Sequence, residues 1–403
     1  MTATSHKWTF VPRFRRNSFG WQSQPTIKRV KEAVAEIKKV AKKDDALAAE
    51  GAVILLEKLV PAIEEVDSSS GAMGATVYKS LAQLAQLIAK AEVDDKQRDL
   101  WLKRLWTAYE DDGYGYLDTM GDHWGTLCGS PAIASQWADG FEFQVRRYWQ
   151  EEGKHRNYYN GVVACLSSLL AAGRHQDLLD LIKHDSSTFW PHQRYGFLAL
   201  AALGRNDEAL KYAEKCRSPN DEQEIDRDCE NLLISIGEVD QAYQKYAMYT
   251  NESNTRINTF RAVAKKYPHK DKSEILMDLI GSTPGSEGKW FATARKLGFM
   301  DLALRLAQKS PCDPTTLNRA AKDTIESNPE FAHGVAMASL HWLCQGWGYE
   351  ITNFDVLESY RHAIQSADAL GVKQQTYQEI TDMVNTAGKD GKFIKKVLGP
   401  HLD

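Results

Sequence analysis

The sequence predicts an all-α protein, built as an α-solenoid of helix–turn–helix repeats with a period of about 31 residues behind an N-terminal helical domain. Two observations predict this fold. Turn residues recur at steps of 31, 33, 31 and 30, at Gly173, Gly204, Gly237, Pro268 and Gly298. Apolar residues also recur four before, one before and nine after each turn residue. These three columns are Leu169, Leu200, Leu233, Ala264 and Ala294; Ala172, Leu203, Ile236, Tyr267 and Leu297; and Ile182, Ala213, Tyr246, Met277 and Ala307.

The spacing around each turn indicates two helices joined by a tight turn. Glycine takes the left-handed conformation that ends a helix without steric cost, so the residues at −4 and −1 should lie on one face of the ending helix. An aspartate follows three residues after four of the five turn residues, where it can accept helix N–H groups and oppose the helix dipole. These are Asp207, Asp240, Asp271 and Asp301. The two short helices of one unit cannot bury their apolar stripes alone, so they need a neighbouring unit stacked on them.

Three stretches carry a family resemblance: GRNDEALKYAEKC, GEVDQAYQKYAMY and GFMDLALRLAQKS. They resemble the second-helix half of tetratricopeptide repeats, with the small residue five after glycine at Ala209, Ala242 and Ala303. The period is shorter than the 34 residues usual in that family. The resemblance implies a right-handed superhelix whose concave face, lined by first helices, binds peptides or proteins. The whole chain is also similar to uncharacterised bacterial helical proteins.

The predicted organisation has four parts: a basic aromatic arm at 1–24, an N-terminal helical domain at 25–152, the repeat segment at 153–346 and C-terminal capping helices at 347–403. Four sequence patterns predict helix starts. They are Asp44 or Asp45, Asp94 with Gln97, Ser327 with Glu330, and Thr352 with Asp355. Helices are expected from Pro25, from 45 to about 66, and at 75–91, 95–110, 131–150, 353–370 and 373–386.

Composition excludes several classes of protein. The chain has 403 residues, of which 43% are hydrophobic and 26% charged, as in ordinary globular proteins. The longest apolar-leaning stretch, 162–172, is too short to span a bilayer, and no secretion signal opens the chain. The six cysteines have no metal-like spacing and are expected to be reduced core thiols. We therefore predict a cytoplasmic protein with no membrane association, cofactor or metal.

Charge is unevenly distributed. Residues 1–43 carry eleven Lys or Arg and two Glu, although the net charge of the chain is −4. The arm mixes its cations with Trp8, Phe10, Phe14, Phe19 and Trp21. This mixture suits phosphate neutralisation with base stacking, but it also suits an arm that packs its aromatics onto the body. The candidate nucleic-acid-binding residues are Lys7, Arg13, Arg15, Arg16, Lys28, Lys31, Lys38 and Lys39. The lysines after residue 25 also fit the solvated face of a core-facing helix.

Two segments contain residues of the kinds that enzymes use. Asp112, Asp118, Asp122 and His123 lie in the least repetitive segment, and they would serve a hydrolase if they converged on one pocket. The alternative is a loop whose carboxylates cap helices and receive the basic arm. The stretch GSTPGSEGKW at 281–290 departs from a phosphate-binding loop at Thr283 and Trp290. No catalytic residue is predicted, although an enzyme is not excluded.

The leading hypothesis is a non-enzymatic adaptor that binds a partner protein or peptide in the groove made by the first helices. The candidate groove residues are Arg194, Arg227, Asn258, Arg261, Lys265 and Arg295. Their positions between the apolar columns would face such a groove, and they also fit ordinary solvated side chains. The alternative function is nucleic-acid binding through the arm and first helix.

Overall fold

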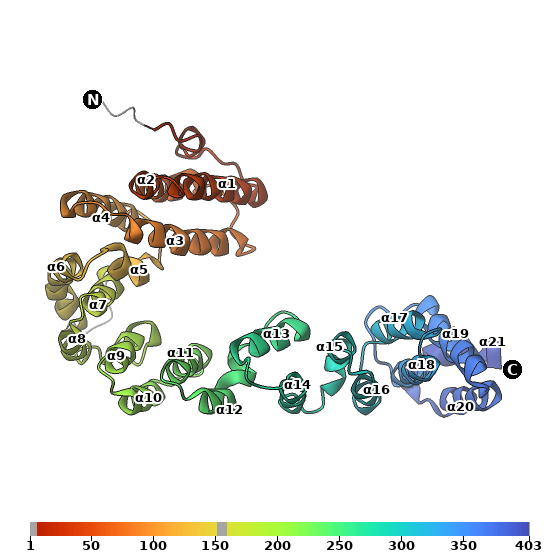
Figure 1. Ribbon diagram of the computed structural model, residues 1–403. Helices are drawn as coiled ribbons and strands as arrows, with labels where there is room; N and C mark the ends of the chain where they lie inside the picture. The colour runs from red at the N-terminus through yellow and green to blue at the C-terminus, as the bar shows by residue number, and fades with distance from the viewer. Residues whose placement is uncertain (1–5, 151–158, 403) are drawn as a thin grey trace. The chain divides into compact units, whose positions relative to one another are not determined.

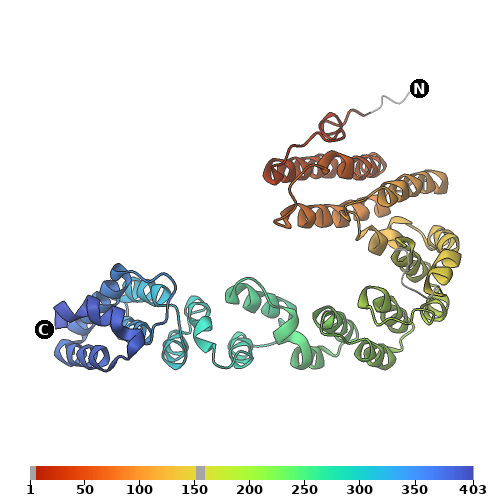
Figure 2. The ribbon, with the colours of Figure 1, turned by 180° about the vertical axis from the view of Figure 1, so that it is seen from behind.

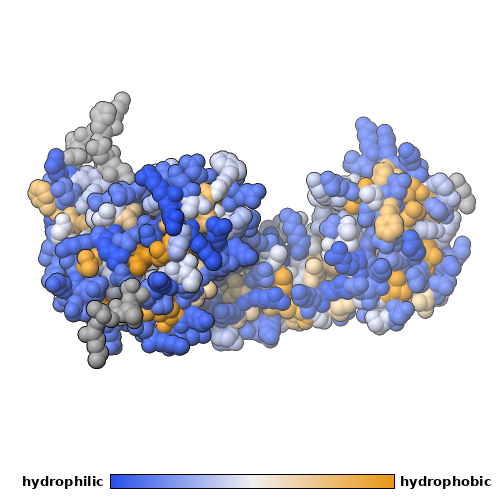
Figure 3. Space-filling model, turned by 90° about the horizontal axis from the view of Figure 1, so that it is seen from above, coloured by the Kyte–Doolittle hydropathy of each residue, from blue (hydrophilic) through white to orange (hydrophobic). Residues whose placement is uncertain are grey.

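The computed structural model describes residues 6–150 and 159–402, and these residues form 21 α-helices and three short 3₁₀ helices with no β-strand (Figure 1). The predicted all-α class is confirmed. The chain divides into two compact units, Met1–Leu232 and Leu233–Asp403. No helix of the described residues is both long and apolar enough to cross a membrane. The surface in Figure 3 is mostly hydrophilic, with apolar residues in separate patches.

The first unit contains the 3₁₀ helix η1 (Val11–Arg13) and helices α1 to α10, and most of α11. The helices are α1 (Ser23–Ala41), α2 (Asp45–Ile63), α3 (Ala72–Lys90), α4 (Asp95–Glu110), α5 (Met120–Leu127), α6 (Pro131–Gln150), α7 (Gly161–Ala171), α8 (His175–Ile182), α9 (Trp190–Ala202), α10 (Asn206–Lys215) and α11 (Glu222–Ser235). In both ribbon views α1 and α2 lie side by side, and α3 packs against both (Figures 1 and 2).

The core of the first unit is centred on α2. Eleven of its 19 residues are buried, because α1, α3, α4 and η1 all pack around it. The apolar stripe of α1, formed by Ile27, Val30, Val34 and Ile37, is buried. Further along, α5 and α6 pack on α7, and α9 packs on α7, α8 and α10. Consecutive helices therefore bury one another's apolar faces.

The second unit contains helices α12 to α21 and two 3₁₀ helices, η2 (Glu287–Trp290) and η3 (Lys389–Gly391). The helices are α12 (Val239–Thr250), α13 (Arg256–Lys266), α14 (Lys272–Gly281), α15 (Phe291–Lys296), α16 (Met300–Lys309), α17 (Pro314–Thr324), α18 (Pro329–Cys344), α19 (Asn353–Leu370), α20 (Lys373–Thr386) and α21 (Lys392–Leu402). The closest packing joins α17, α18 and α19. Between them the buried side chains of Asn318, Ser339 and Ser359 hydrogen-bond one another, with distances of 2.6 to 3.0 Å.

The glycine turns have the predicted conformation. Gly173, Gly204, Gly237 and Gly298 all have positive φ, between 72° and 88°. At Gly204, the glycine N–H donates to the Ala201 carbonyl and the following Arg205 N–H donates to the Leu200 carbonyl, at 2.9 Å each. The same pair of bonds recurs at the other three glycines. This is the Schellman motif, and it satisfies carbonyls that the ending helix would leave unpaired.

The predicted aspartate caps are only partly correct. Asp271 is an N-cap, accepting from the N–H groups of Ser273 and Glu274 at 2.8 and 3.4 Å. Asp207, Asp240 and Asp301 instead lie inside the first turn of their helices. The reason is the turn: after a Schellman glycine the next helix begins two residues on, whereas Pro268 delays it by two further residues. The three first-turn carboxylates oppose the helix dipole without capping it.

Two of the apolar columns include exposed side chains. Most of the −4 column is buried, but Leu203 and Ile236 of the −1 column are 43% and 40% exposed. They stand at the residue before the glycine, where the backbone leaves the packed face. Met277 of the +9 column is 52% exposed. Leu203, Ile236 and Met277 therefore do not face the core, although they stand in the apolar columns.

Helix starts follow the predicted caps at three of four sites. Asp44 accepts from Leu47 N–H, Asp94 accepts from Gln97 N–H, and Thr352 with Asp355 forms a capping box. The box predicted at Ser327 and Glu330 is wrong, because Asn328 caps α18 by accepting from Phe331 N–H at 3.1 Å. The four-part domain division stays a prediction, and its boundary at 152/153 lies outside the described residues.

Candidate partner-binding surfaces

The aromatic residues of the arm are buried against the body. Trp8, Phe10, Phe14 and Phe19 are 2 to 6% exposed, and successive rings meet at centroid distances of 5.2 to 6.1 Å. Gly51 of α2 makes room for Trp8, because a Cβ at Gly51 would lie 2.3 Å from the indole ring. Base stacking by these four rings is therefore blocked, and Trp21, at 72% exposure, is the arm's exposed ring.

Backbone and ionic contacts fasten the arm. Glu36 accepts from the Thr9 N–H at 2.7 Å, and the Asn17 N–H donates to the Pro61 carbonyl at 2.9 Å. Arg13 lies 3.4 Å from Glu32 in an exposed pair, the kind of pair that contributes little. The cations predicted to bind nucleic acid remain at the surface. Lys7, Arg13, Arg15, Arg16, Lys28, Lys31, Lys38 and Lys39 are all exposed.

Asp112, Asp118, Asp122 and His123 are the residues that would serve a hydrolase, and two of them, Asp112 and Asp122, accept hydrogen bonds from groups outside this set. Asp112 accepts from the N–H groups of Tyr114 and Leu117 at 3.1 and 2.6 Å, so it shapes the loop before α5. Partial burial and the neighbouring Asp112 carboxylate raise the pKa of Asp118. Asp122 accepts from the Tyr195 hydroxyl of α9 at 2.9 Å. Burial lowers the pKa of His123, opposed by Asp122. Asp112 therefore shapes the loop and Asp122 joins α5 to α9, but none of these contacts caps a helix or binds the basic arm.

Arg194, a predicted groove residue, lies between two carboxylates. Its guanidinium is 3.8 Å from Asp122 and 3.7 Å from Asp228. Asp228 also accepts from the Trp190 indole N–H at 3.0 Å, and burial raises its pKa while Arg194 opposes that shift. Arg194 therefore ties α9 to α5 and α11 and is only partly available to a partner. Arg227 is exposed on α11.

Three predicted groove residues form an exposed stripe on α13. Asn258, Arg261 and Lys265 are spaced by three and four residues, which places them on one helix face. The opposite face buries Phe260 and Val263. Among the described residues, neither Arg261 nor Lys265 forms a salt bridge. Arg295 of α15 is instead held by Asp323 at 2.8 Å. The stripe of α13 is therefore the predicted groove segment best exposed for binding.

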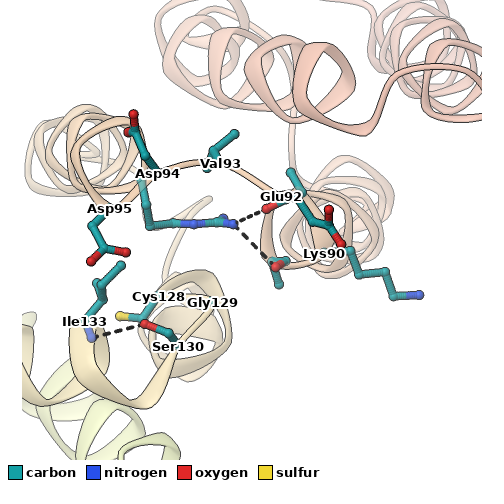
Figure 4. A pocket seen from close by; sticks show the side chains of 12 residues that line it. Lys90, Glu92, Val93, Asp94, Asp95, Cys128, Gly129, Ser130 and Ile133 are labelled. Carbon is teal, nitrogen blue, oxygen red and sulfur yellow. Dashed lines mark hydrogen bonds between the residues drawn. The ribbon is translucent and has the colours of Figure 1, made fainter.

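A cavity of about 610 Å³ lies between the C-terminus of α3 and the start of α6 (Figure 4). Arg98 reaches into this region, and its guanidinium donates to the carbonyls of Ile88 and Ala91 at the end of α3. Arg98 is 5% exposed and pairs with no carboxylate among the described residues, and burial lowers its pKa. Gly129 has φ of 72°, and a Cβ there would lie 3.0 Å from the guanidinium. Arg98 thus serves as a cap for α3.

A second cavity, of about 640 Å³, lies on the side of the second helices α8 and α10. Sequence reasoning missed it, because it searched the first helices for a groove. Its walls include Leu179 and Ile182 of α8 and Tyr212 of α10, with the 183–189 loop at one edge. A usable signal was present: α10 carries Lys211 and Lys215 four residues apart beside the apolar column.

In the described part of the chain, no three His, Cys, Asp or Glu side chains lie close enough together to bind a metal ion. The six cysteines are buried and form no disulfide, as predicted. Burial raises the pKa of Cys128 and Cys312 to about 12, which leaves them protonated and unreactive. In the stretch 281–290, Gly288 packs against the Ser310 and Pro311 carbonyls. The backbone at this glycine is therefore not open to a phosphate group. No family model matches the chain, and no curated protein matches it.

Proposed function

We propose that this chain is a tetratricopeptide-like helical-repeat scaffold that binds a partner protein or peptide through the exposed stripe Asn258, Arg261 and Lys265 of α13. The observation that carries the proposal is this stripe: three polar side chains on one helix face, with the opposite face buried. The four identical glycine turns support the repeat architecture. Two cations on the stripe favour a partner with acidic groups.

The test compares charge reversals on two helices of the same unit. The double variant R261E/K265E alters the stripe, and K245E on α12 alters an exposed lysine outside it. Both are purified as full-length protein and used to recover the partner that co-purifies with the native chain. Recovery should fall at least tenfold with R261E/K265E, because two attractions become two repulsions, and should hold with K245E. Equal recovery by all three proteins would remove the stripe from the proposal.

Nucleic-acid binding is a second candidate, favoured by one observation: the lysine face of α1 is exposed beside the arm arginines. With four of the five arm aromatics buried, such binding would be mainly electrostatic and strongly salt-dependent. The quadruple variant K28E/K31E/K38E/K39E should abolish a gel shift of a 30-base-pair duplex at 50 mM salt. No shift with the unaltered chain under those conditions would end this candidate.

A further inference from the structure

The cavity between α8 and α10 combines an apolar interior with unpaired positive charge at its edge. Leu179, Ile182 and Leu200, all under 10% exposed, provide apolar lining. Its volume of about 640 Å³ is within the usual range for small-molecule sites. A recess of this size can hold the apolar part of a small ligand.

The polar floor of the cavity is fixed by internal hydrogen bonds. Gln193, 5% exposed, accepts from the Tyr212 hydroxyl and donates to the Ser187 carbonyl at 2.9 Å. Tyr212 can lie across α9 because residue 196 is glycine, and a Cβ there would be 2.8 Å from the hydroxyl. The floor is therefore pre-formed, which reduces the entropy lost when a ligand binds.

The carboxylates that line the cavity are already paired. Asp185, with its side chain 1% exposed, lies 3.1 Å from His192. Burial alone would raise the pKa of Asp185, but hydrogen bonds from His192 and Ser187 outweigh it and the pKa is lowered. Glu208 is held by Arg205, whose Nε is 2.8 Å from it. Neither carboxylate offers an uncompensated charge to a cation.

The positive edge is less completely paired. Lys183 contacts Asp180 at 2.6 Å. The cations of this edge that could still pair with a ligand are Lys211 and Lys215 of α10. These two lysines are exposed, lie one helical turn apart, and form no salt bridge within the described residues. The charge available at the cavity is therefore positive.

We propose that this cavity binds a small amphipathic anion, whose apolar body contacts Leu179, Ile182 and Leu200 and whose carboxylate or phosphate group is held by Lys211 and Lys215. The surface lies on second helices of the first unit, so this site is separate from the α13 stripe.

The experiment uses the full-length protein and the fluorescent probe 8-anilinonaphthalene-1-sulfonate, an apolar ring system with one anionic group. The unaltered protein should show one saturable site. Decanoate and decyl phosphate should each displace the probe, and the tighter of the two identifies the preferred head group. Decyltrimethylammonium, with the same alkyl chain and opposite charge, should displace it at least tenfold less well.

Two variants test the residues. K211E/K215E should weaken probe binding at least tenfold, and T188W, which replaces an exposed lining residue with a bulky one, should remove the site. K245E on α12 is the matched control and should bind as the unaltered protein does. Thermal unfolding checks that each variant is folded. The proposal is overturned by the absence of saturable binding, by equal displacement with the cationic amphiphile, or by unchanged binding in both site variants.

Discussion

At the scale of single residues, the most unusual environment is that of Arg98, an arginine whose side chain is buried. Its charge is buried without a carboxylate partner in the described part of the chain, and the oxygens around it are backbone carbonyls at the end of α3. Such carbonyls carry a partial negative charge from the helix dipole, so they favour a cation. One long side chain from α4 thereby satisfies the end of a different helix.

Removing that cap should destabilise the first unit. We expect Arg98→Met to lower the free energy of unfolding by about 1 to 3 kcal/mol, because the carbonyls of Ile88 and Ala91 stay buried and lose the guanidinium as a donor. Urea unfolding measures the change. The matched control is Arg205→Met, which removes an exposed arginine paired with Glu208 and should leave the free energy of unfolding nearly unchanged. Equal costs for the two substitutions would contradict the capping role.

A second residue-scale prediction concerns Gly51 below Trp8. Glycine inside a helix normally costs about 1 kcal/mol relative to alanine, so Gly51→Ala would ordinarily stabilise α2. Here the added methyl would meet the indole ring at 2.3 Å, and the arm must move. We expect Gly51→Ala to destabilise the full chain and to speed trypsin cleavage at Arg13, Arg15 and Arg16. In a chain lacking residues 1–21 the same substitution should be stabilising, and destabilisation there would show that Trp8 is not the cause.

At the scale of elements, the glycine turns are interchangeable and the proline turn is not. Four turns share the same pair of backbone hydrogen bonds, so each depends on the left-handed glycine alone. At Pro268 no such bonds form, and Asp271 supplies the cap for the next helix. The glycine turns therefore depend on glycine for their stability, whereas the proline turn depends on Asp271.

This difference gives a direct test. Gly204→Ala should lower the free energy of unfolding by about 1 kcal/mol, because alanine at φ of 72° is strained. Gly281→Ala is the control: Gly281 ends α14 without positive φ and with open space around it, so the change should be neutral or stabilising. Denaturant unfolding of both variants decides the matter. A cost at Gly281 equal to that at Gly204 would contradict it.

Helix positions were more predictable from the sequence than helix-to-helix contacts. Asp94 with Gln97 and Thr352 with Asp355 act locally, so the sequence alone locates the starts of α4 and α19. The cavity beside α10 depends on Gly196 and Tyr212, which come together only when α9 and α10 pack. Sequence spacing could not reveal that contact. The same limit explains Arg194, whose two carboxylate neighbours lie on α5 and α11.

At the scale of the whole molecule, burial of histidines couples stability to pH. His123, His333 and His362 each have a pKa lowered mainly by burial. The unfolded chain, with histidine pKa near 6.5, then binds protons more readily than the folded chain. Stability contributed by these neutral side chains is fully present above about pH 6.5 and is lost as the pH falls below it.

We therefore expect the free energy of unfolding to be lower at pH 5.5 than at pH 7.5, measured by urea unfolding at fixed ionic strength. Substituting His123, His333 and His362 together with glutamine, which cannot titrate, should flatten that dependence. A pH dependence unchanged in the triple variant would assign it to other groups.

The packing of Trp8 against Gly51 also affects how the chain folds during its synthesis. A ribosome releases the arm first and its receptor on α2 roughly 40 residues later, which at 5 to 20 residues per second is a delay of about 2 to 8 s. During that interval four large aromatic side chains have nowhere to pack. The arm can therefore take its final place only after the second helix has emerged.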